Sequence, residues 1–290
     1  MTHALWKIRA GDTDLLASGP ADCGPDQLLA EHDLDLLLAR GAGALVAALA
    51  KPGGGPVPAG ARVVAPIGTQ PVWASGVTYE RSRAARNAES DTPDIYDRVY
   101  QAERPELFFK AAASAVRGPG EPVGIRADSS WNVPEPEVTL VLDSSGQVAG
   151  YCCGNDMSSR SIEGENPLYL PQAKVYRDSC ALGPCIAPAA NINFEDLTVR
   201  LLIRRDNTDA FDERIHTSQI RRRAAELAAW LYRALEFPHG AFLMTGAGIV
   251  PPESFTLRAG DEVRVEVNGL GSLINPVHTI GSKGHRANDE

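Results

Sequence analysis

Apolar residues follow a helical spacing near the N-terminus of the chain. In residues 26–51, "DQLLAEHDLDLLLARGAGALVAALAK", they recur every three or four positions, and Gly41 and Gly43 break the pattern. Residues 51–61, "KPGGGPVPAGA", are rich in proline and glycine, which is typical of a connector between domains. The pattern predicts a small N-terminal α+β domain over residues 1–65 and a larger domain over residues 66–290.

Beyond the connector, short runs with the period of a β-strand dominate. These runs are "RVVAPI", "EVTLVLD", "QVAGYCC", "LTVRLLI" and "DEVRVEV". Helical patterns occupy residues 79–103 and 219–236, and they do not alternate regularly with the strands. A doubly wound parallel sheet is therefore disfavoured, and a β-rich α+β fold is expected.

One predicted hairpin brings acidic residues together. Residues 131–156 read "WNVPEPEVTLVLDSSGQVAGYCCGND", two strands around the turn signal "DSSGQ". Glu135 and Glu137 are two residues apart, so their side chains project from the same face of a strand. If the chain folds back near residue 145, position 155 lies roughly opposite position 135, and Asp156 returns beside both glutamates. We therefore expect three carboxylates to converge.

Such a cluster favours a bound cation. Three carboxylates within a few ångströms cannot all ionise cheaply, and a divalent ion relieves their repulsion. Oxygen ligands favour Mg²⁺, with Mn²⁺ or Ca²⁺ as possibilities. The competing interpretation is a set of solvated acids at a sheet edge, where Pro136, which has no N–H, would also fit. That interpretation suits one isolated glutamate better than three converging acids.

Four other residues are candidates for chemistry, although each has an ordinary structural explanation. Lys174 in "LPQAKVY" could neutralise an enolate or carry a proton, but most lysines lie on the surface. Glu106 precedes the apolar "LFF", where a carboxylate can have a raised pKa and act as a base. Thr245, before a glycine-rich loop, could bind a carboxylate or simply form a turn. Arg160 could bind Asp156 or an anionic ligand, and a structural salt bridge is the commoner outcome.

Composition excludes several classes of function. With 28 basic and 37 acidic residues the net charge is −9, which disfavours nucleic-acid binding. The basic run at residues 221–223 is expected to be a solvated helix start. No apolar run is long enough to span a membrane, and no targeting signal is evident. The odd number of cysteines, without any Cys-x-x-Cys pair, indicates reduced thiols in the cytoplasm. No phosphate-binding loop, dinucleotide fingerprint or serine-nucleophile motif occurs.

Several motifs, taken in order, resemble the fumarylacetoacetate hydrolase family. They are "PEPEVTLVLD", "GYCCGNDMSSR", "QAK", "ALGPCI", "TGAGIVPP" and "GDEVRVEVNGLGSLINPV", and the match covers roughly residues 65–280. The resemblance implies a mixed β-roll catalytic domain and a homodimer or homotetramer. It also implies a Mg²⁺ ion held by Glu135, Glu137 and Asp156, an active-site lysine at Lys174 and a substrate-binding threonine at Thr245.

Two departures from the family pattern narrow the expected activity. Members that hydrolyse carbon–carbon bonds carry a histidine three residues after a tyrosine, and Ser82 occupies that place here. Arg177 stands where many relatives have an acid. The stretches "WASGVTYERS" and "IYDRVYQAERPELFFKA" resemble instead the branch that dehydrates 2-keto-3-deoxy sugar acids, in which the glutamate at position 106 is implicated in catalysis.

The expected function is therefore metal-dependent dehydration of a 2-keto-3-deoxypentonate, the xylonate or the arabinonate, to 2,5-dioxopentanoate through an enolate. Neither the formation of the enolate nor the loss of the hydroxyl group requires a histidine or a water nucleophile. Glu106 or Lys174 would act as the base. The alternatives are a hydrolase of acylpyruvates or other β-diketones, an oxaloacetate decarboxylase of the same family, and a ligand-binding relative without activity.

Overall fold

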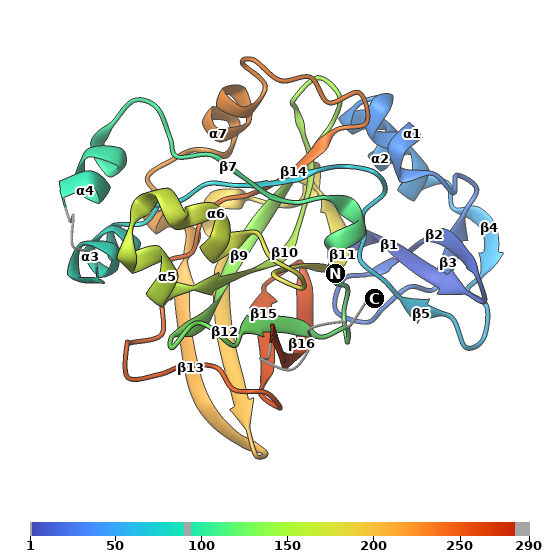
Figure 1. Ribbon diagram of the computed structural model, residues 1–290. Coiled ribbons are helices and arrows are strands. Elements are labelled where there is room, and N and C mark those ends of the chain that lie inside the picture. Colours follow the sequence, from blue (N-terminus) through green and yellow to red (C-terminus); the bar gives the residue numbers. More distant parts are fainter. Residues whose placement is uncertain (1, 90–93, 282–290) are drawn as a thin grey trace, which may run out of the picture.

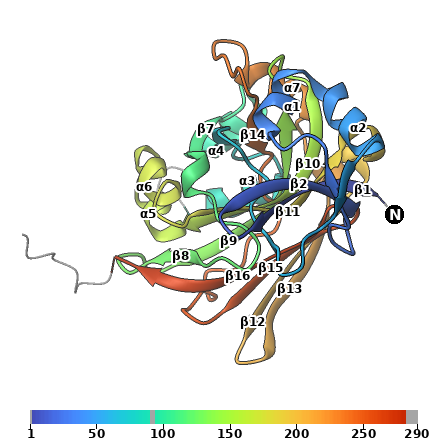
Figure 2. The same ribbon diagram turned by 90° about the vertical axis from the view of Figure 1, so that its right-hand side faces the viewer.

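Two β-sheets packed face to face form the body of the protein, with helices around them (Figures 1 and 2). The computed structural model describes residues 2–89 and 94–281. One sheet has eleven strands and the other has five. The β-rich α+β fold expected from the sequence is confirmed. Within the described residues, no helix combines the length and the apolar character that crossing a membrane requires.

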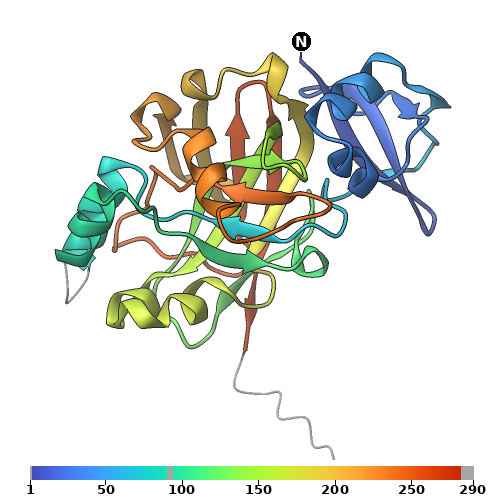
Figure 3. The ribbon, with the colours of Figure 1, turned by 90° about the horizontal axis from the view of Figure 1, so that it is seen from above.

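The N-terminal segment forms a unit of short strands and two helices at one side of the body (Figure 3). Its elements are β1 (His3–Ala10), β2 (Thr13–Pro20), β3 (Gln27–Leu29), α1 (Leu34–Ala39), α2 (Ala42–Ala50), β4 (Gly53–Pro56) and β5 (Arg62–Val63). Asp33 begins α1 by accepting hydrogen bonds from two backbone N–H groups of the first turn, which otherwise lack partners. Gly41, with φ 96°, separates the two helices. The domain boundary near residue 65 stays a prediction, because β1 pairs with a strand of the body, Leu5 opposite Ile186.

The strands of the larger sheet follow the order β4-β3-β2-β1-β11-β10-β9-β14-β6-β7, with β5 beside β1. Those of the body are β6 (Val72–Ala74), β7 (Phe108–Ala111), β9 (Asn132–Leu142), β10 (Val148–Ser159), β11 (Cys180–Pro188) and β14 (Ala241–Met244). β9 and β10 form the long hairpin that the sequence predicts. β14 pairs with β9 only as far as Thr139, so the first half of β9 has β10 as its strand partner. Pro136 lies in that half, where a residue without an N–H is tolerated.

The smaller sheet has the order β13-β12-β15-β16-β8. Its strands are β8 (Val123–Arg126), β12 (Thr198–Arg205), β13 (Thr208–His216), β15 (Glu262–Val267) and β16 (Gly271–Ile280). The main apolar core involves one face of β9, with Val138, Leu140 and Leu142, and buried residues of the smaller sheet. The opposite face of β9 carries Val141 in a second apolar cluster, which includes residues of α1 and α2.

The remaining elements are short helices. They are α3 (Glu80–Glu89), α4 (Asp94–Gln101), η1 (Ala113–Ala115), α5 (Arg160–Glu165), η2 (Pro167–Tyr169), α6 (Leu170–Lys174), η3 (Ala189–Asn191), η4 (Phe194–Asp196), η5 (Thr217–Gln219) and α7 (Ala224–Leu231). Helices α3 and α4 confirm the helical pattern at residues 79–103 on the residues that are described. The pattern at residues 219–236 overestimates α7, whose eight residues span less than half of that range.

The prediction that residues 221–223 are the solvated start of a helix is correct for Arg221 and Arg223, which are exposed just before α7, and wrong for Arg222. Helix α7 begins only after them, and Arg222 is buried, with 7% of its surface exposed. Its guanidinium donates to the backbone carbonyl oxygen of Glu103 at 2.7 Å and to the carboxylate of Glu226 at 2.6 Å. Arg222 therefore links the segment before β7 to the start of α7 through these hydrogen bonds.

Candidate active site

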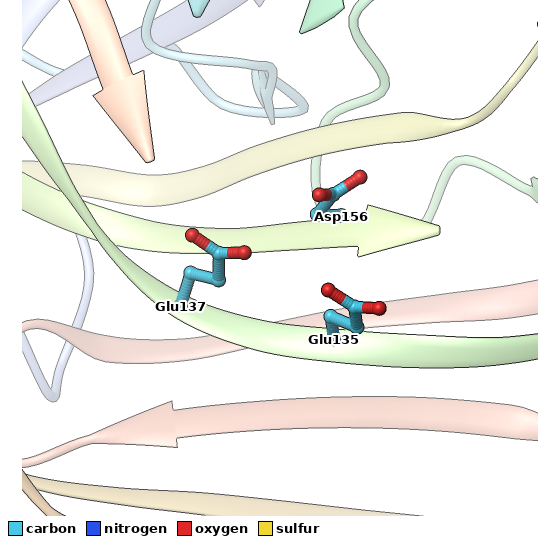
Figure 4. A group of neighbouring side chains, drawn as sticks. All are labelled: Glu135, Glu137 and Asp156. Carbon is cyan, nitrogen blue, oxygen red and sulfur yellow. The ribbon is translucent and has the colours of Figure 1, made fainter. Parts of the chain in front are cut away.

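The three predicted acids converge on one face of the β9–β10 hairpin (Figure 4). Glu135 and Glu137 project from β9, and Asp156 projects from β10 directly opposite Glu135. Each residue offers one carboxylate oxygen, and these oxygens lie within 4.8 Å of one another. All three residues are at most 5% exposed. They are not solvated acids at a sheet edge.

A β-bulge brings Asp156 to the face that carries the glutamates. Leu142 lies opposite Val148 and Val141 lies opposite Gly150, so Ala149 is an extra residue in β10. If the same sequence paired in regular register, without the bulge, Asn155 would face Glu135 and Asp156 would point to the other side of the sheet. The predicted convergence is correct, and the predicted pairing of position 155 with position 135 is wrong by one residue.

Three buried cations compensate the charge of the acids. Lys174 at the end of α6 places its Nζ 2.7 Å from Glu135 Oε2 and 2.9 Å from Asp156 Oδ2. Lys110 of β7 places its Nζ 2.5 Å from Asp156 Oδ1. Arg160 Nη1 lies 3.3 Å from Glu135 Oε1. Because buried charges are costly without partners, these contacts stabilise the acids together.

Glu137 differs from the other two acids in its partners. Its Oε2 accepts a hydrogen bond from the backbone N–H of Gly246 at 2.5 Å. Burial, together with the charges of Asp156 and Glu135, raises the pKa of Glu137 well above its ordinary value. A divalent cation among the three oxygens would reverse that effect, since it favours the charged form of each carboxylate. The all-oxygen donor set suits a hard ion such as Mg²⁺.

A narrow cavity extends from the three acids. Glu106, Ser82 and Lys174 line it, as does Glu163 of α5. The carboxylate of Glu106 lies against Gly76, where a Cβ would come within 2.0 Å of its Oε2. The structure thus brings Glu106 and Lys174 to the same cavity as the acids. Ser82, which stands in the place of the family's histidine, also faces this space.

Two predicted binding residues lie beside the cavity rather than among the residues that line it. The hydroxyl of Thr245 donates to the backbone carbonyl oxygen of Val138 at 2.8 Å, and the residue is fully buried. Arg160 contacts Glu135 and stacks on the ring of Trp131, with 5.5 Å from its Cζ to the ring centre. The structural role that was the commoner expectation for Arg160 is present, with Glu135 rather than Asp156 as the ion-pair partner. Substrate binding by Thr245 and by Arg160 stays a prediction.

Lys110 and Glu163 were not predicted from the sequence. Lys110 ends the apolar run "LFFK", and strand alternation on β7 places it on the same face as Phe108. That alternation was the available signal for a buried lysine. Glu163 lies in α5, the short helix that follows β10, and no spacing rule predicts that this helix places it at the cavity.

A larger cavity, about 560 Å³ in volume, lies elsewhere. Residues from β1, from the segment before β6 and from η1 contribute to its lining, among them Lys7, Arg9 and Arg117. It contains none of the predicted site residues. The convergent acids and lysines identify the smaller cavity as the site of chemistry.

The chain is similar to several known proteins in sequence and in structure. The chain is 45% identical over 216 residues to the probable 2-keto-3-deoxyxylonate dehydratase of Haloferax volcanii, with 74% of each chain covered. It is 40% identical over 221 residues to the 2-dehydro-3-deoxy-D-arabinonate dehydratase of Saccharolobus solfataricus, again with 74% of each covered. A solved structure of 2-keto-3-deoxy-D-arabinonate dehydratase, complexed with magnesium and 2,5-dioxopentanoate, superposes with a TM-score of 0.82 at 33% identity. It covers 95% of this chain and 98% of its own.

A family model described as the C-terminal domain of fumarylacetoacetate hydrolase matches residues 72–278. That range contains the three acids and the other residues named for the smaller cavity, and it spans more than half of the chain. The chain therefore belongs to the fumarylacetoacetate hydrolase family.

Proposed function

We propose that this protein is a magnesium-dependent dehydratase that converts a 2-keto-3-deoxypentonate to 2,5-dioxopentanoate. The observation that carries the proposal is the buried triad Glu135, Glu137 and Asp156 at the end of a cavity that also holds Lys174 and Glu106. The two dehydratases to which the chain is 45% and 40% identical support the same reaction.

Glu135, Glu137 and Asp156 would hold the ion, with Mn²⁺ or Ca²⁺ as possible substitutes. When bound, the ion supplies positive charge that polarises a 2-keto acid and lowers the pKa of its C3 protons. The protein contributes three oxygen ligands on rigid strands, which leaves coordination positions for the substrate.

Lys174 stabilises negative charge beside the triad. Its ammonium group contacts Glu135 and Asp156, so it lies at the end of the cavity where the carboxylate and ketone of the substrate bind. As the C3 proton leaves, negative charge develops on the ketone oxygen, and a fixed ammonium group lowers the energy of that state.

Glu106 is the group that we assign to proton transfer. It lies against Gly76 on the wall of the cavity that the triad also lines. It removes a C3 proton and delivers a proton to the C4 hydroxyl, which leaves as water while a C3–C4 double bond forms. Tautomerisation toward C5 then gives the dioxo acid, so the net change is the loss of one water.

The alternatives differ in what they require of the cavity. Hydrolysis of an acylpyruvate or another β-diketone needs an activated water, and Ser82 replaces the histidine associated with that step. Decarboxylation of oxaloacetate requires only the ion and an enolate. A ligand-binding relative without activity would have no use for a buried Lys174 beside the three acids.

The test is an assay of purified protein with 2-keto-3-deoxyxylonate and 2-keto-3-deoxyarabinonate, with and without a chelator. We expect 2,5-dioxopentanoate from at least one of them and no product after chelation. Cleavage of an acylpyruvate or loss of CO₂ from oxaloacetate, with no aldehyde product from either sugar acid, would reverse the ranking of these functions.

We also infer that the protein acts in the cytoplasm, in pentose breakdown, as a homodimer or homotetramer. The free state of all five cysteines supports a reducing compartment. Exposed apolar side chains such as Leu168, which is 84% exposed, are consistent with contacts between subunits. Size-exclusion chromatography with light scattering measures the mass of the protein in solution and tests whether it is a dimer or a tetramer.

A further inference from the structure

Lys110 is a buried lysine that the proposed reaction does not use. It lies in β7, and only 1% of its surface is exposed. Unlike Lys174, it is not among the residues that line the cavity of the three acids. An ammonium group in the interior of a protein is costly unless its contacts compensate the lost hydration. For Lys110, those contacts connect two residues of the site.

Three oxygen atoms surround the ammonium group of Lys110. Its Nζ lies 2.5 Å from Asp156 Oδ1, and it donates to the backbone carbonyl oxygens of Met157 at 3.0 Å and Lys174 at 2.5 Å. A lysine ammonium group has three N–H bonds, so these three oxygens account for all of its donors. Lys110 can therefore act on the reaction only through the residues that it contacts.

These contacts form a closed ring with Asp156 and Lys174. Lys110 contacts one carboxylate oxygen of Asp156, Lys174 Nζ lies 2.9 Å from the other, and the Lys174 carbonyl oxygen accepts from Lys110. Lys174 ends α6, which has only five residues and depends on tertiary contacts for its position. Ser179 Oγ also donates to the Lys174 carbonyl oxygen, at 2.9 Å. The ring therefore connects α6 to β7 and β10, two strands of the larger sheet.

We propose that Lys110 is a positioning residue, which orients the carboxylate of Asp156 toward the metal ion and holds Lys174 beside it. This inference rests on the proposed function. Partners that orient a metal ligand without touching the ion typically account for about 10–100-fold in metal affinity or activity. If the ring opened, Asp156 could rotate and the end of α6 could shift, so that both the ligand and the lysine would lose their alignment.

A role in charge balance alone predicts the opposite effect on the metal ion. The charge of Lys110 lies beside a metal ligand and repels a divalent cation, so its removal would strengthen metal binding if Asp156 kept its position. Loss of the position of Asp156 weakens metal binding instead. The sign of the change in metal affinity therefore distinguishes positioning from charge balance.

The experiment measures Mn²⁺ affinity by isothermal titration without substrate, and kcat and KM at saturating Mg²⁺. Lys110→Met removes the ammonium group, and Lys110→Gln keeps two N–H donors without the charge. Ser179→Ala removes the other donor to the Lys174 carbonyl oxygen and leaves Lys110 in place. Leu45→Ala in the apolar core beside α1 and α2 is the control for lost stability, since Leu45 does not line the cavity.

We expect Lys110→Met to weaken Mn²⁺ binding by about 10–100-fold and to lower kcat by at least about tenfold. KM for the sugar acid should change by no more than about threefold, because Lys110 makes no contact with the substrate. Lys110→Gln should show smaller losses, since its amide still donates. Leu45→Ala and Ser179→Ala should keep both Mn²⁺ affinity and kcat within about threefold, because Lys110 still donates to the same oxygens in these variants.

Unchanged or tighter Mn²⁺ binding by Lys110→Met would overturn the positioning role, and so would weaker binding with an unchanged kcat. An equal loss in Leu45→Ala would assign the effect to stability instead. If neither Lys110 variant folds, Ser179→Ala decides, since a loss of about tenfold there would show that Ser179 holds Lys174. If the unaltered protein turns over neither sugar acid, the proposed function fails, and Mn²⁺ titration of the same variants still tests Lys110.

Discussion

Asp156 lies directly opposite Glu135 in the β9–β10 pair, because the pairing shifts by one residue at the bulge that contains Ala149. Residues that face each other across an antiparallel pair project to the same side of the sheet. The bulge is therefore the feature that turns two strand acids and one returning aspartate into a single three-oxygen site. Its position near the turn leaves the seven following pairs, down to Asp156, in regular register.

The first prediction concerns the ion itself. Glu137→Gln keeps the shape of the side chain and removes one of the three negative charges. We expect Mg²⁺ affinity to fall by at least about 100-fold, more than the loss of an outer-shell partner usually costs. Isothermal titration with Mg²⁺ measures this, and Glu165→Gln on the exposed side of α5 is the control. An unchanged affinity would mean that the three acids do not bind the ion.

A second prediction separates proton transfer from metal binding. Glu106→Gln removes the group that we assign to the C3 and C4 protons and leaves the triad intact. We expect kcat to fall by about 10²–10⁴, the usual contribution of a general acid–base. The Mg²⁺ dissociation constant should not change. Glu103→Gln, an exposed neighbour on the same segment, should retain full activity. Near-normal turnover by Glu106→Gln would transfer the base role to Lys174.

The spacing of residues in the sequence was sufficient to predict the centre of the site. Glu135 and Glu137 share a face because strand side chains alternate, and the turn signal at residues 143–147 sets the hairpin. The bulge could not be predicted, because nothing in "QVAGYC" says which residue lacks a partner. The three acids were therefore brought together correctly by an argument whose register was wrong by one residue.

Residues that reach the site from other elements were harder to predict. Lys110 and Glu163 belong to β7 and α5, and their positions depend on how those elements pack against the hairpin. Arg222 was also mispredicted because its position depends on tertiary contacts, but here a residue expected to be exposed is buried. A run of arginines before an amphipathic segment usually faces water, and here tertiary contacts bury its middle residue.

Lys110 gives a prediction about stability. Its ammonium group is buried, contacts Asp156 and donates to the backbone carbonyl oxygens of Met157 and Lys174. Lys110→Met removes one partner of a buried ion pair and two hydrogen bonds to backbone carbonyl oxygens. We expect the free energy of unfolding to fall by about 3–5 kcal/mol.

Urea denaturation followed by circular dichroism measures the effect of Lys110→Met. Lys51→Met, which changes an exposed lysine, is the matched control and should cost less than about 0.5 kcal/mol. If the two variants are equally stable, Asp156 does not depend on Lys110 for its charge balance.

Substitution of Gly246 tests the conformation of the loop whose backbone N–H group donates to Glu137. Gly246 has a φ of 94°, and an added Cβ would come within 2.1 Å of Thr78 Oγ1. Gly260 has a φ of 93° with open space around it, so Gly260→Ala incurs the backbone strain without the clash. We expect Gly246→Ala to lower the free energy of unfolding by at least about 1 kcal/mol more than Gly260→Ala, and also to weaken Mg²⁺ binding, because the N–H of Gly246 holds Glu137. Thermal unfolding and Mg²⁺ titration of both variants decide this. Equal effects of the two substitutions would mean that the loop adapts without strain.

The β1–β2 hairpin carries an ion pair whose contribution depends on pH. Arg9 donates to both carboxylate oxygens of Asp14, at 2.5 and 2.9 Å, and Lys7 lies 3.1 Å away. The hydrogen bonds from Arg9 lower the pKa of Asp14 to about 2. The unfolded state then binds more protons than the folded state between about pH 4 and pH 2, so this stabilisation is complete above about pH 4 and is lost as the pH falls toward 2.

Asp14→Asn should therefore reduce the free energy of unfolding at neutral pH and have progressively less effect in acid. A shift of this size corresponds to about 2.5 kcal/mol for a buried group, and solvent screening of a side chain that is 31% exposed reduces it to about 1 kcal/mol. Urea denaturation at about pH 7, 5 and 3 gives the difference between Asp14→Asn and the unaltered protein, with Asp12→Asn in the adjacent turn as control. A difference that grows as the pH falls would contradict the assignment, because it would require a pKa of Asp14 that is raised by folding.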